Sequence, residues 1–178
     1  MKNFFFKILL IFFSIVNING YQPVPELDLT KYDKTWFQVY GNNFDKLFEN
    51  GSCIKANYQI IDSNNVSVLN TQINNQGKFD SITGFAYYKE DHVGGELTVK
   101  LDGQNEAPYW VIELGPIVDN KYDYSIVSDN LKLSLFVLAR NVDNFFKTYN
   151  DQVMESLKNF GFTNVINKPV MTNQSKNC

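Results

Sequence analysis

From residue 36 to residue 140, hydrophobic and polar residues alternate in short runs, and clusters of Asn, Asp, Gly and Ser separate these runs. Alternation with a period of two is typical of strands with one buried face, and the polar clusters are typical of turns. The pattern predicts eight strands: Trp36–Phe44, Cys53–Ile61, Val66–Ile73, Ser81–Tyr88, Glu96–Leu101, Tyr109–Leu114, Tyr122–Val127 and Leu133–Arg140. Because short turns join them, they indicate a mainly β fold, an eight-stranded up-and-down antiparallel barrel, with a β-sandwich as the competing architecture.

The segment that leads into the first strand is extended and ends at a large aromatic residue. Pro23 and Pro25 exclude a helix at its start, and Asp28–Tyr32 has room for one short helical turn. Trp36 then stands at the mouth of the first strand. There it either plugs the interior or serves as an ordinary core residue.

After residue 148 the hydrophobic period changes from that of a strand to that of a helix. Thr148–Asp151 resembles a capping box, Gly161 suits the position just past a helix, and four apolar residues lie between them at helical spacing: Val153, Met154, Leu157 and Phe160. The pattern predicts one helix over residues 149–160, packed on the outside of the barrel. Beyond it we expect a short extended piece that Pro169 keeps out of a central strand, with three apolar residues: Phe162, Val165 and Ile166.

The longest early connection, residues 41–51, is too apolar for a bare linker because it contains Phe44, Leu47 and Phe48. A long loop in a compact β domain is often functional. This loop either covers the barrel interior as a lid or tucks into the nearest edge of the core.

The composition indicates the size of the domain and the compartment in which the protein is expected to function. The chain has 178 residues, enough for one domain with a sizeable core. Its net charge is −3, so it has no excess of positive charge that would attract nucleic acid. Residues 1–20 begin with Lys2 and Lys7, continue in an apolar run and end at Gly20, which predicts a secretory signal peptide cleaved after that glycine. A retained membrane anchor is the alternative. The domain then comprises residues 21–178.

Two cysteines and three glycosylation sequons fit an extracellular protein. Cys53 and Cys178 form an even set, which favours a disulfide in an oxidising compartment, whereas free or intermolecular thiols are the alternative. The sequons begin at Asn50, Asn65 and Asn173. Asn65 is the preferred acceptor because it lies at a predicted hairpin tip, and Asn50 is crowded by the nearby cysteine.

Catalytic and metal chemistry find little support in the sequence. The single histidine, His92, lies in a polar loop and cannot build a metal site alone. Three carboxylates near the seventh predicted strand could bind a cation weakly, but solvated turn residues are commoner: Asp119, Asp123 and Asp129. We therefore expect neither an enzyme nor a cofactor.

Four stretches of the chain resemble the lipocalins, and most closely their apolipoprotein D and bacterial outer-membrane branch: LDLTKYDKTWFQVY (27–40), FENGSCIKANYQI (48–60), APYW (107–110) and LSLFVLARN (133–141). The resemblance implies a lipocalin-like barrel over nearly all of the mature chain. It places Trp36 in the family's G-x-W motif and Arg140 at the end of the eighth strand, where the two stack and close one end of the barrel. It also implies that Cys53 pairs with Cys178.

Two departures from the family pattern stand out. Lys34 occupies the glycine position of the G-x-W motif, so the local backbone has to suit a side chain. The family's T-D-Y motif is missing, and residues 113–124 read ELGPIVDNKYDY, a longer segment than usual.

Strand alternation and the resemblance together predict which side chains face the interior. If Arg140 points to the barrel axis, alternate residues of that strand do too, and if Cys53 points outward, Ala56 points inward. The resemblance implies that Val68 of the third strand also lies inside. The predicted ligand-binding set is Tyr58, Asn70, Gln72, Tyr109, Phe136 and Leu138. An apolar cavity with a few hydrogen-bonding groups suits a small lipophile with one polar end, unless these side chains simply fill the barrel.

We therefore predict a secreted binding protein that carries a small hydrophobic ligand, such as a fatty acid, lysophospholipid, sterol or pigment, in the barrel cavity. The alternative is an extracellular interaction protein that uses the barrel exterior or the 41–51 loop to engage a receptor or a membrane. The sequence predicts no oligomeric state and no particular ligand, because apolar cavities discriminate weakly between similar lipophiles.

Overall fold

The computed structural model describes residues 21–44, 51–92, 94–175 and 178. Eight antiparallel strands form a closed barrel in which each strand pairs with its neighbour and β10 returns to pair with β1. The strands are β1 (Lys34–Gly41), β2 (Ser52–Ile60), β3 (Asn65–Ile73), β4 (Phe79–Tyr87), β5 (Glu96–Leu101), β6 (Ala107–Leu114), β9 (Tyr124–Ser128) and β10 (Leu135–Ala139). The predicted up-and-down barrel is confirmed, and the closure of β1 on β10 excludes the sandwich.

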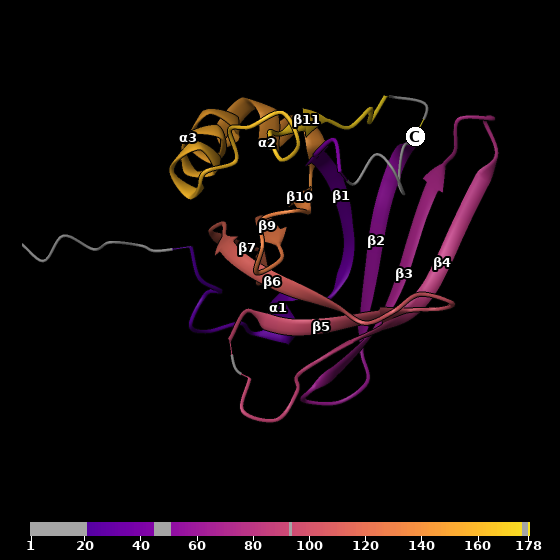
Figure 1. Cartoon of the computed structure of the whole chain (residues 1–178), viewed down its shortest axis with the longest axis vertical. Helices are drawn as coiled ribbons and strands as arrows, with labels where there is room; N and C mark the ends of the chain where they lie inside the picture. Colours follow the sequence, from indigo (N-terminus) through magenta and orange to yellow (C-terminus); the bar gives the residue numbers. More distant parts are fainter. Residues whose placement is uncertain (1–20, 45–50, 93, 176–177) are drawn as a thin grey trace, which may run out of the picture.

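Alternation along the strands divides the hydrophobic side chains between the two faces of the barrel wall. Inward residues form one cluster that includes Trp36, Tyr58 and Leu138. Outward residues of β1, β6, β9 and β10 form a second cluster with the helices, and that cluster includes Val137 and Leu157. The wall of β3 and β4 lies on the opposite side of the barrel from the helices (Figure 1).

Three helices accompany the barrel in the described part of the chain, where the sequence predicted one helix and a short turn. The predicted turn forms α1 (Leu29–Tyr32), with the Asp28 side chain accepting from the Thr30 N–H. The C-terminal part contains α2 (Val142–Thr148) and α3 (Asn150–Phe160), side by side on one wall of the barrel (Figure 1).

The predicted helix 149–160 is confirmed as α3, which starts one residue later, but the predicted capping box is wrong. Thr148 is the last residue of α2 and not a capping residue of α3, whose N-terminus has no side-chain cap. The side chain that caps is Asn141, which accepts from the Asn144 N–H at the start of α2. The end was right, because Gly161 has a φ of 89° and terminates α3 in the left-handed conformation.

The segment after α3 also differs from the prediction. Residues 164–168 form turns instead of an extended piece, and Val165 and Ile166 are exposed there. The Asn164 side chain accepts from the N–H groups of Ile166 and Asn167, which stabilises the turn. Extended structure begins only after Pro169, in β11 (Val170–Met171), which pairs with the end of β1.

The unusual segment 113–124 contains an extra hairpin. β7 (Ile117–Val118) pairs with β8 (Lys121–Tyr122), and the turn residues Asp119 and Asn120 both have positive φ, 48° and 62°. The predicted strand Tyr122–Val127 is therefore split between β8 and β9. The hairpin lies against α1, since Lys121 bonds to Asp33 and to the Thr30 carbonyl.

The predicted first strand was too long at its C-terminal end. β1 stops at Gly41, and Phe44 is half-buried in the turn that follows. Leu47, Phe48 and the sequon at Asn50 lie outside the described residues, as does the predicted signal peptide 1–20. No helix among the described residues is long and apolar enough to cross a lipid bilayer.

Candidate ligand-binding site

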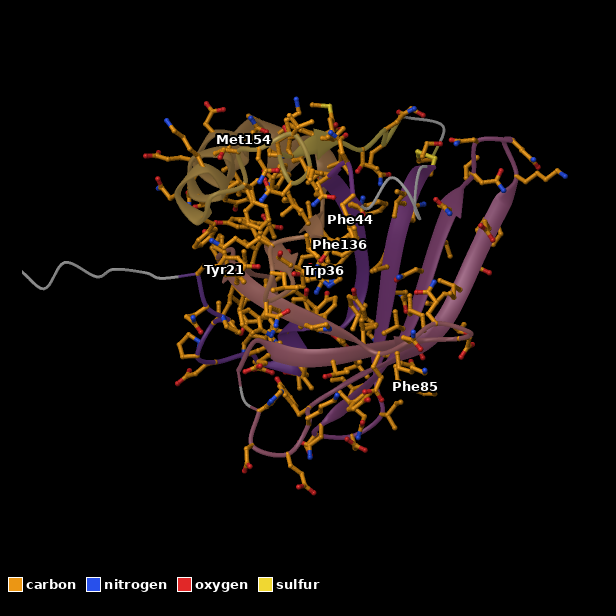
Figure 2. All side chains as sticks on the ribbon, viewed as in Figure 1. Tyr21, Trp36, Phe44, Phe85, Phe136 and Met154 are labelled. Atoms are coloured by element: carbon orange, nitrogen blue, oxygen red, sulfur yellow. A yellow bond between two sulfur atoms is a disulfide. The ribbon has the colours of Figure 1, made fainter. Side chains whose placement is uncertain are left out.

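A cavity of about 460 Å³ occupies the interior of the barrel. Its lining mixes apolar and polar side chains, with aliphatic contributions from Ile54, Val68 and Leu101 on three different strands. All six residues that the sequence predicted for a ligand site lie on this lining: Tyr58, Asn70, Gln72, Tyr109, Phe136 and Leu138. Figure 2 shows Phe136 and Trp36 in the middle of the molecule, whereas Phe85 lies at its periphery.

The register between β2 and β3 places their inward-facing residues at three depths of the cavity. Tyr58 pairs with Val68, and Ala56 pairs with Asn70 one step nearer the open end. Inward residues on neighbouring strands form layers because side chains alternate with a period of two. Gln72 follows at the rim, where its amide accepts from the Gly51 N–H.

The deep end of the cavity is a cluster of buried hydroxyl groups. The Tyr109 hydroxyl lies 2.8 Å from that of Tyr32 and 2.9 Å from that of Tyr58, and Tyr32 also lies 3.1 Å from the Ser125 hydroxyl. Burial raises the pKa of Tyr32 to about 12 and that of Tyr109 well above its ordinary value. The floor of the cavity is therefore polar but uncharged at neutral pH.

Below this floor, Trp36 and Arg140 close the barrel. The Arg140 guanidinium lies 3.6 Å from the centre of the Trp36 ring, and it donates to the carbonyls of Lys31, Tyr32, Thr35 and Tyr122. Trp36 is fully buried, and its indole N–H also donates to the Tyr32 carbonyl. The guanidinium stacks on the indole and also donates to carbonyls of α1, β1 and β8. It therefore holds these three elements in place. Trp36 therefore closes the base and lines no part of the cavity.

The expectation that the backbone at Lys34 suits a side chain is wrong, because Lys34 keeps the conformation that suits a glycine. Its φ is 75°, in the left-handed region that L-residues seldom adopt. The side chain points to solvent, with its ammonium 3.5 Å from the Asp33 carboxylate. The fold accordingly tolerates a side chain at this position without changing the backbone, at a local conformational cost.

At the open end, the C-terminal tail completes the wall between β1 and β2. The β1–β2 ladder extends only from Lys34 to Phe37 on β1. Above it, the Thr172 N–H donates to the Val39 carbonyl, and the Cys53 N–H donates to the Asn173 carbonyl. A disulfide between Cys53 and Cys178 fixes the tail there, as the resemblance implied.

Two glutamines seal the same junction. The Gln174 side chain donates to the carbonyls of Gln38 and Ile54, on β1 and β2 respectively. Gln38 itself lines the cavity and donates to the Thr172 hydroxyl. The tail is thus part of the barrel wall next to the cavity mouth.

Other side chains considered for chemistry take structural roles. Asp129 accepts from the N–H groups of Leu131 and Ser134 and so organises the β9–β10 turn. The Asp123 carboxylate accepts from the Asn144 amide. Within the described part of the chain, no group of three His, Cys, Asp or Glu side chains could hold a metal ion.

Sequence reasoning missed three residues that shape the cavity: Tyr32, Gln38 and Ser125. Gln38 could have been found, because it lies two residues after Trp36 on the same strand and so faces the same side. Tyr32 and Ser125 could not, because the Tyr32 hydroxyl reaches those of Tyr109 and Ser125 only through the packing of α1 beneath the barrel.

The barrel, its closed base and its internal cavity define a lipocalin. The model of the lipocalin-like domain family matches residues 27–169, and the chain belongs to that family.

Among individual proteins, the chain is similar in sequence to apolipoprotein D from several mammals. It is 35% identical to the protein from Bos taurus over 92 residues, which cover 51% of this chain and 48% of the relative. The chain therefore spans about half the length of the first relatives that it matches. A longer match, to apolipoprotein D of Macaca fascicularis, is 28% identical over 166 residues and covers 88% of this chain and 82% of the relative. Lobster apocrustacyanin A1 shares the fold, with a TM-score of 0.64 at 18% identity over 84% of this chain and 81% of its own.

Proposed function

We propose that this protein is a secreted carrier that holds one small hydrophobic ligand in the barrel cavity. The observation that carries the proposal is the cavity itself, which is about 460 Å³ in volume and lined mainly by aliphatic and aromatic side chains. Pockets of roughly 300–1,000 Å³ with apolar walls and a few polar groups are typical of small-molecule sites. The proposal includes no chemical step, so the function is binding and transport.

In this proposal the six predicted residues divide into two roles. Phe136 and Leu138, on adjacent inward positions of β10, provide apolar contact with the body of the ligand. The polar members provide hydrogen-bonding positions at different depths: Tyr58, Tyr109, Asn70 and Gln72. Gln72 contributes least, because its amide already contacts Gly51 and Asp80.

A pair of substitutions on β2 tests the proposal. Ala56→Phe places a large side chain in the cavity, whereas Gln59→Phe places the same side chain on the exposed outer face. We expect A56F to abolish the binding of fluorescent retinoids and fatty acids to delipidated protein, while Q59F retains it. If A56F binds these probes as well as the unsubstituted protein, the ligand site is elsewhere.

We also propose that the mature protein begins at Tyr21 and is glycosylated. A disulfide that ties the tail to β2 supports an oxidising compartment. Asn173 is exposed, whereas the Asn65 amide donates to the Asp62 carboxylate, so Asn173 is the more accessible of these two sequons. Asn50 lies outside the described residues. N-terminal sequencing of protein secreted by eukaryotic cells, and its mass before and after enzymatic removal of glycans, check these points.

One observation favours a second candidate function, in which the barrel exterior engages a receptor or a membrane. The wall opposite the helices exposes two large apolar side chains of β4, Phe79 and Phe85. Replacing both with serine should leave retinoid binding unchanged in the carrier function. A loss of cell-surface or vesicle binding in the same variant would support the second function.

A further inference from the structure

We propose that the outer wall of the barrel holds the N-glycan of Asn65, and that the first sugars of this glycan pack against Phe85. The inference rests on the glycosylation proposed above and goes beyond the carrier function, because this surface lies outside the cavity. Three features of β2, β3 and β4 carry it: the position of the sequon, a groove next to it, and the exposed side chains that line the groove.

The sequon lies on the outward face of β3, in register with aromatic residues of β4. Asn65 is the first residue of β3 and pairs with Tyr87. Ser67, the third residue of the sequon, pairs with Phe85. The intervening Val66 is buried in the inward cluster, so Asn65 and Ser67 both face outward. Diagonal neighbours on one face of an antiparallel pair lie about 7–8 Å apart, so Phe85 is within reach of the first sugars attached to Asn65.

A groove of about 370 Å³ lies on this outer face. Ser67 forms part of its floor, between Gln59 of β2 and Phe85 of β4. A small side chain between two longer ones leaves the hollow. Six outward-facing strand residues line the groove: Asn57, Gln59, Ser67, Leu69, Thr83 and Phe85. Ser67 therefore belongs both to the sequon and to the groove, and a glycan on Asn65 reaches the groove along its own strand.

The lining combines apolar surface with hydrogen-bonding groups. Phe85 is 51% exposed and Leu69 is 40% exposed, and Figure 2 shows Phe85 at the periphery of the molecule. The side chains of Gln59 and Thr83 add an amide and a hydroxyl group. A sugar ring has a face of C–H groups, which packs on the negative face of an aromatic ring, and a rim of hydroxyl groups, which bond to amides and hydroxyls. A purely apolar partner would instead remove water from these polar groups without replacing it.

The contact between Asn65 and Asp62 is compatible with a glycan. The Asn65 Nδ2 atom lies 2.9 Å from each oxygen of the Asp62 carboxylate. One N–H group can be shared between two acceptors in this way, and a glycosylated asparagine retains one hydrogen on Nδ2. Asp62 also accepts from the Asn64 N–H and so fixes the turn before β3. The carboxylate therefore holds the Asn65 amide in a defined orientation next to the groove.

Thermal unfolding tests whether the glycan packs on the wall. Asn50→Gln and Asn173→Gln leave Asn65 as the one remaining sequon. This chain would be secreted from eukaryotic cells, which attach the glycan, and produced in the bacterial periplasm, which forms the disulfide without attaching one. We expect peptide mass spectrometry to show that Asn65 is occupied, and we expect the glycan to raise the melting temperature by about 2–4 °C. An unoccupied Asn65 or an unchanged melting temperature would overturn the inference.

A pair of substitutions on β4 identifies the aromatic residue responsible. Phe85→Ser should remove most of the increase in melting temperature that the glycan gives, because it removes the ring on which the sugar packs. Phe79→Ser is the matched control, since Phe79 lies on the same face of β4, is 68% exposed and pairs with Ile73 at the far end of the strand. In F79S the glycan should raise the melting temperature as much as in the chain without this substitution. An increase of the same size in F85S would overturn the contact with Phe85.

Nuclear magnetic resonance of the glycan measures this contact directly. Protons over the face of an aromatic ring resonate upfield of their positions in a free glycan, because of the ring current. We expect such shifts for the first sugars of an isotope-labelled glycan on Asn65. They should be lost in Phe85→Leu, which keeps an apolar side chain without a ring. Sugar resonances that are identical in the two proteins would contradict the packing, whatever the melting temperatures.

Retinol binding by the same proteins separates this inference from the carrier function. The groove and the cavity lie on opposite sides of the wall formed by β2, β3 and β4, so retinol should bind the glycosylated and unglycosylated chains with equal affinity. Failure of retinol to bind either form would contradict the carrier function and leave the role of Phe85 unchanged. A glycan on Asn65 that blocks retinol binding would overturn its placement on the outer wall.

Discussion

The two ends of the barrel are held together by different means. At the closed end, Trp36, Arg140 and the tyrosine cluster join α1 to β1, β2 and β6 through packing and short hydrogen bonds. At the open end, β1 and β2 diverge, and the C-terminal tail bridges them under a single disulfide. The closed end therefore depends on buried side chains, whereas the open end depends on a cross-link. We therefore expect the contacts of the tail with β1 and β2 to loosen before those of the closed end.

The largest expected effect comes from the closed end. Trp36→Ala removes a fully buried indole and the surface on which Arg140 stacks, so it should lower the free energy of unfolding by about 3–5 kcal/mol. Trp110→Ala, on the outside of β6, is the control and should cost less, because Trp110 is only partly buried. Urea unfolding followed by circular dichroism measures both. Equal losses would contradict the special role of the closed end.

Breaking the disulfide should have the next largest effect. Replacing Cys53 and Cys178 together with serine should lower the free energy of unfolding by about 2–4 kcal/mol, because the cross-link closes a long loop of 125 residues in the unfolded chain. Hydrogen exchange should show the loss of protection concentrated at the backbone N–H groups of residues 53 and 172, while Trp36 and its neighbours keep theirs. An unchanged melting temperature would show that the tail holds without the cross-link.

Alkaline pH should weaken the closed end through Tyr32. The pKa of Tyr32 is raised to about 12, chiefly by burial, so its folded form resists ionisation that the unfolded chain undergoes near its ordinary value of 10.0. The stabilisation is fully present below about pH 10 and is lost as the pH rises to about 12, on the order of 2–3 kcal/mol in total. Unfolding measured across this range should show a smaller loss in Tyr32→Phe. If Y32F has the same pH dependence, Tyr32 is not the group responsible.

The smallest expected effect is a gain in stability at the closed end. Lys34→Gly should raise the free energy of unfolding by up to about 1 kcal/mol, because glycine adopts a positive φ without steric cost. Thr35→Gly is the matched control, since Thr35 is equally exposed but lies in regular strand. That substitution should destabilise the protein. A loss of stability in K34G would mean that the Lys34 side chain contributes more than its backbone costs.

The local hydrophobic pattern was sufficient to predict the barrel strands, which repeat along the chain. Alternation identified all eight barrel strands and the inward face of β2, because one-sided burial requires a period of two. The inward residues of β3 came from the family resemblance, and those of β10 came from alternation once the resemblance had placed Arg140. It underestimated the helical region, although Asn141 and the spacing of Val142, Phe145 and Phe146 already suggested a helix before residue 148.

The remaining parts depend on contacts between distant segments. The tail donates hydrogen bonds to the carbonyls of Val39 and Ile54 only when the barrel closes. The same holds for the hydrogen bond between the hydroxyls of Tyr32 and Tyr109. The positive φ of Lys34 could not be predicted from the residue type either, because lysine seldom adopts that backbone conformation. The six lining residues were predicted correctly as inward-facing, and their role in binding stays a prediction.

Native mass spectrometry of the secreted protein, purified without detergent, tests the carrier function most directly. We expect a mass above that of the glycosylated chain by one small lipophile, which organic extraction removes and which added retinol replaces at one molecule per chain. A mass equal to that of the chain with its glycans, together with no mass added by retinol, retinoic acid or a fatty acid, would contradict the proposed function.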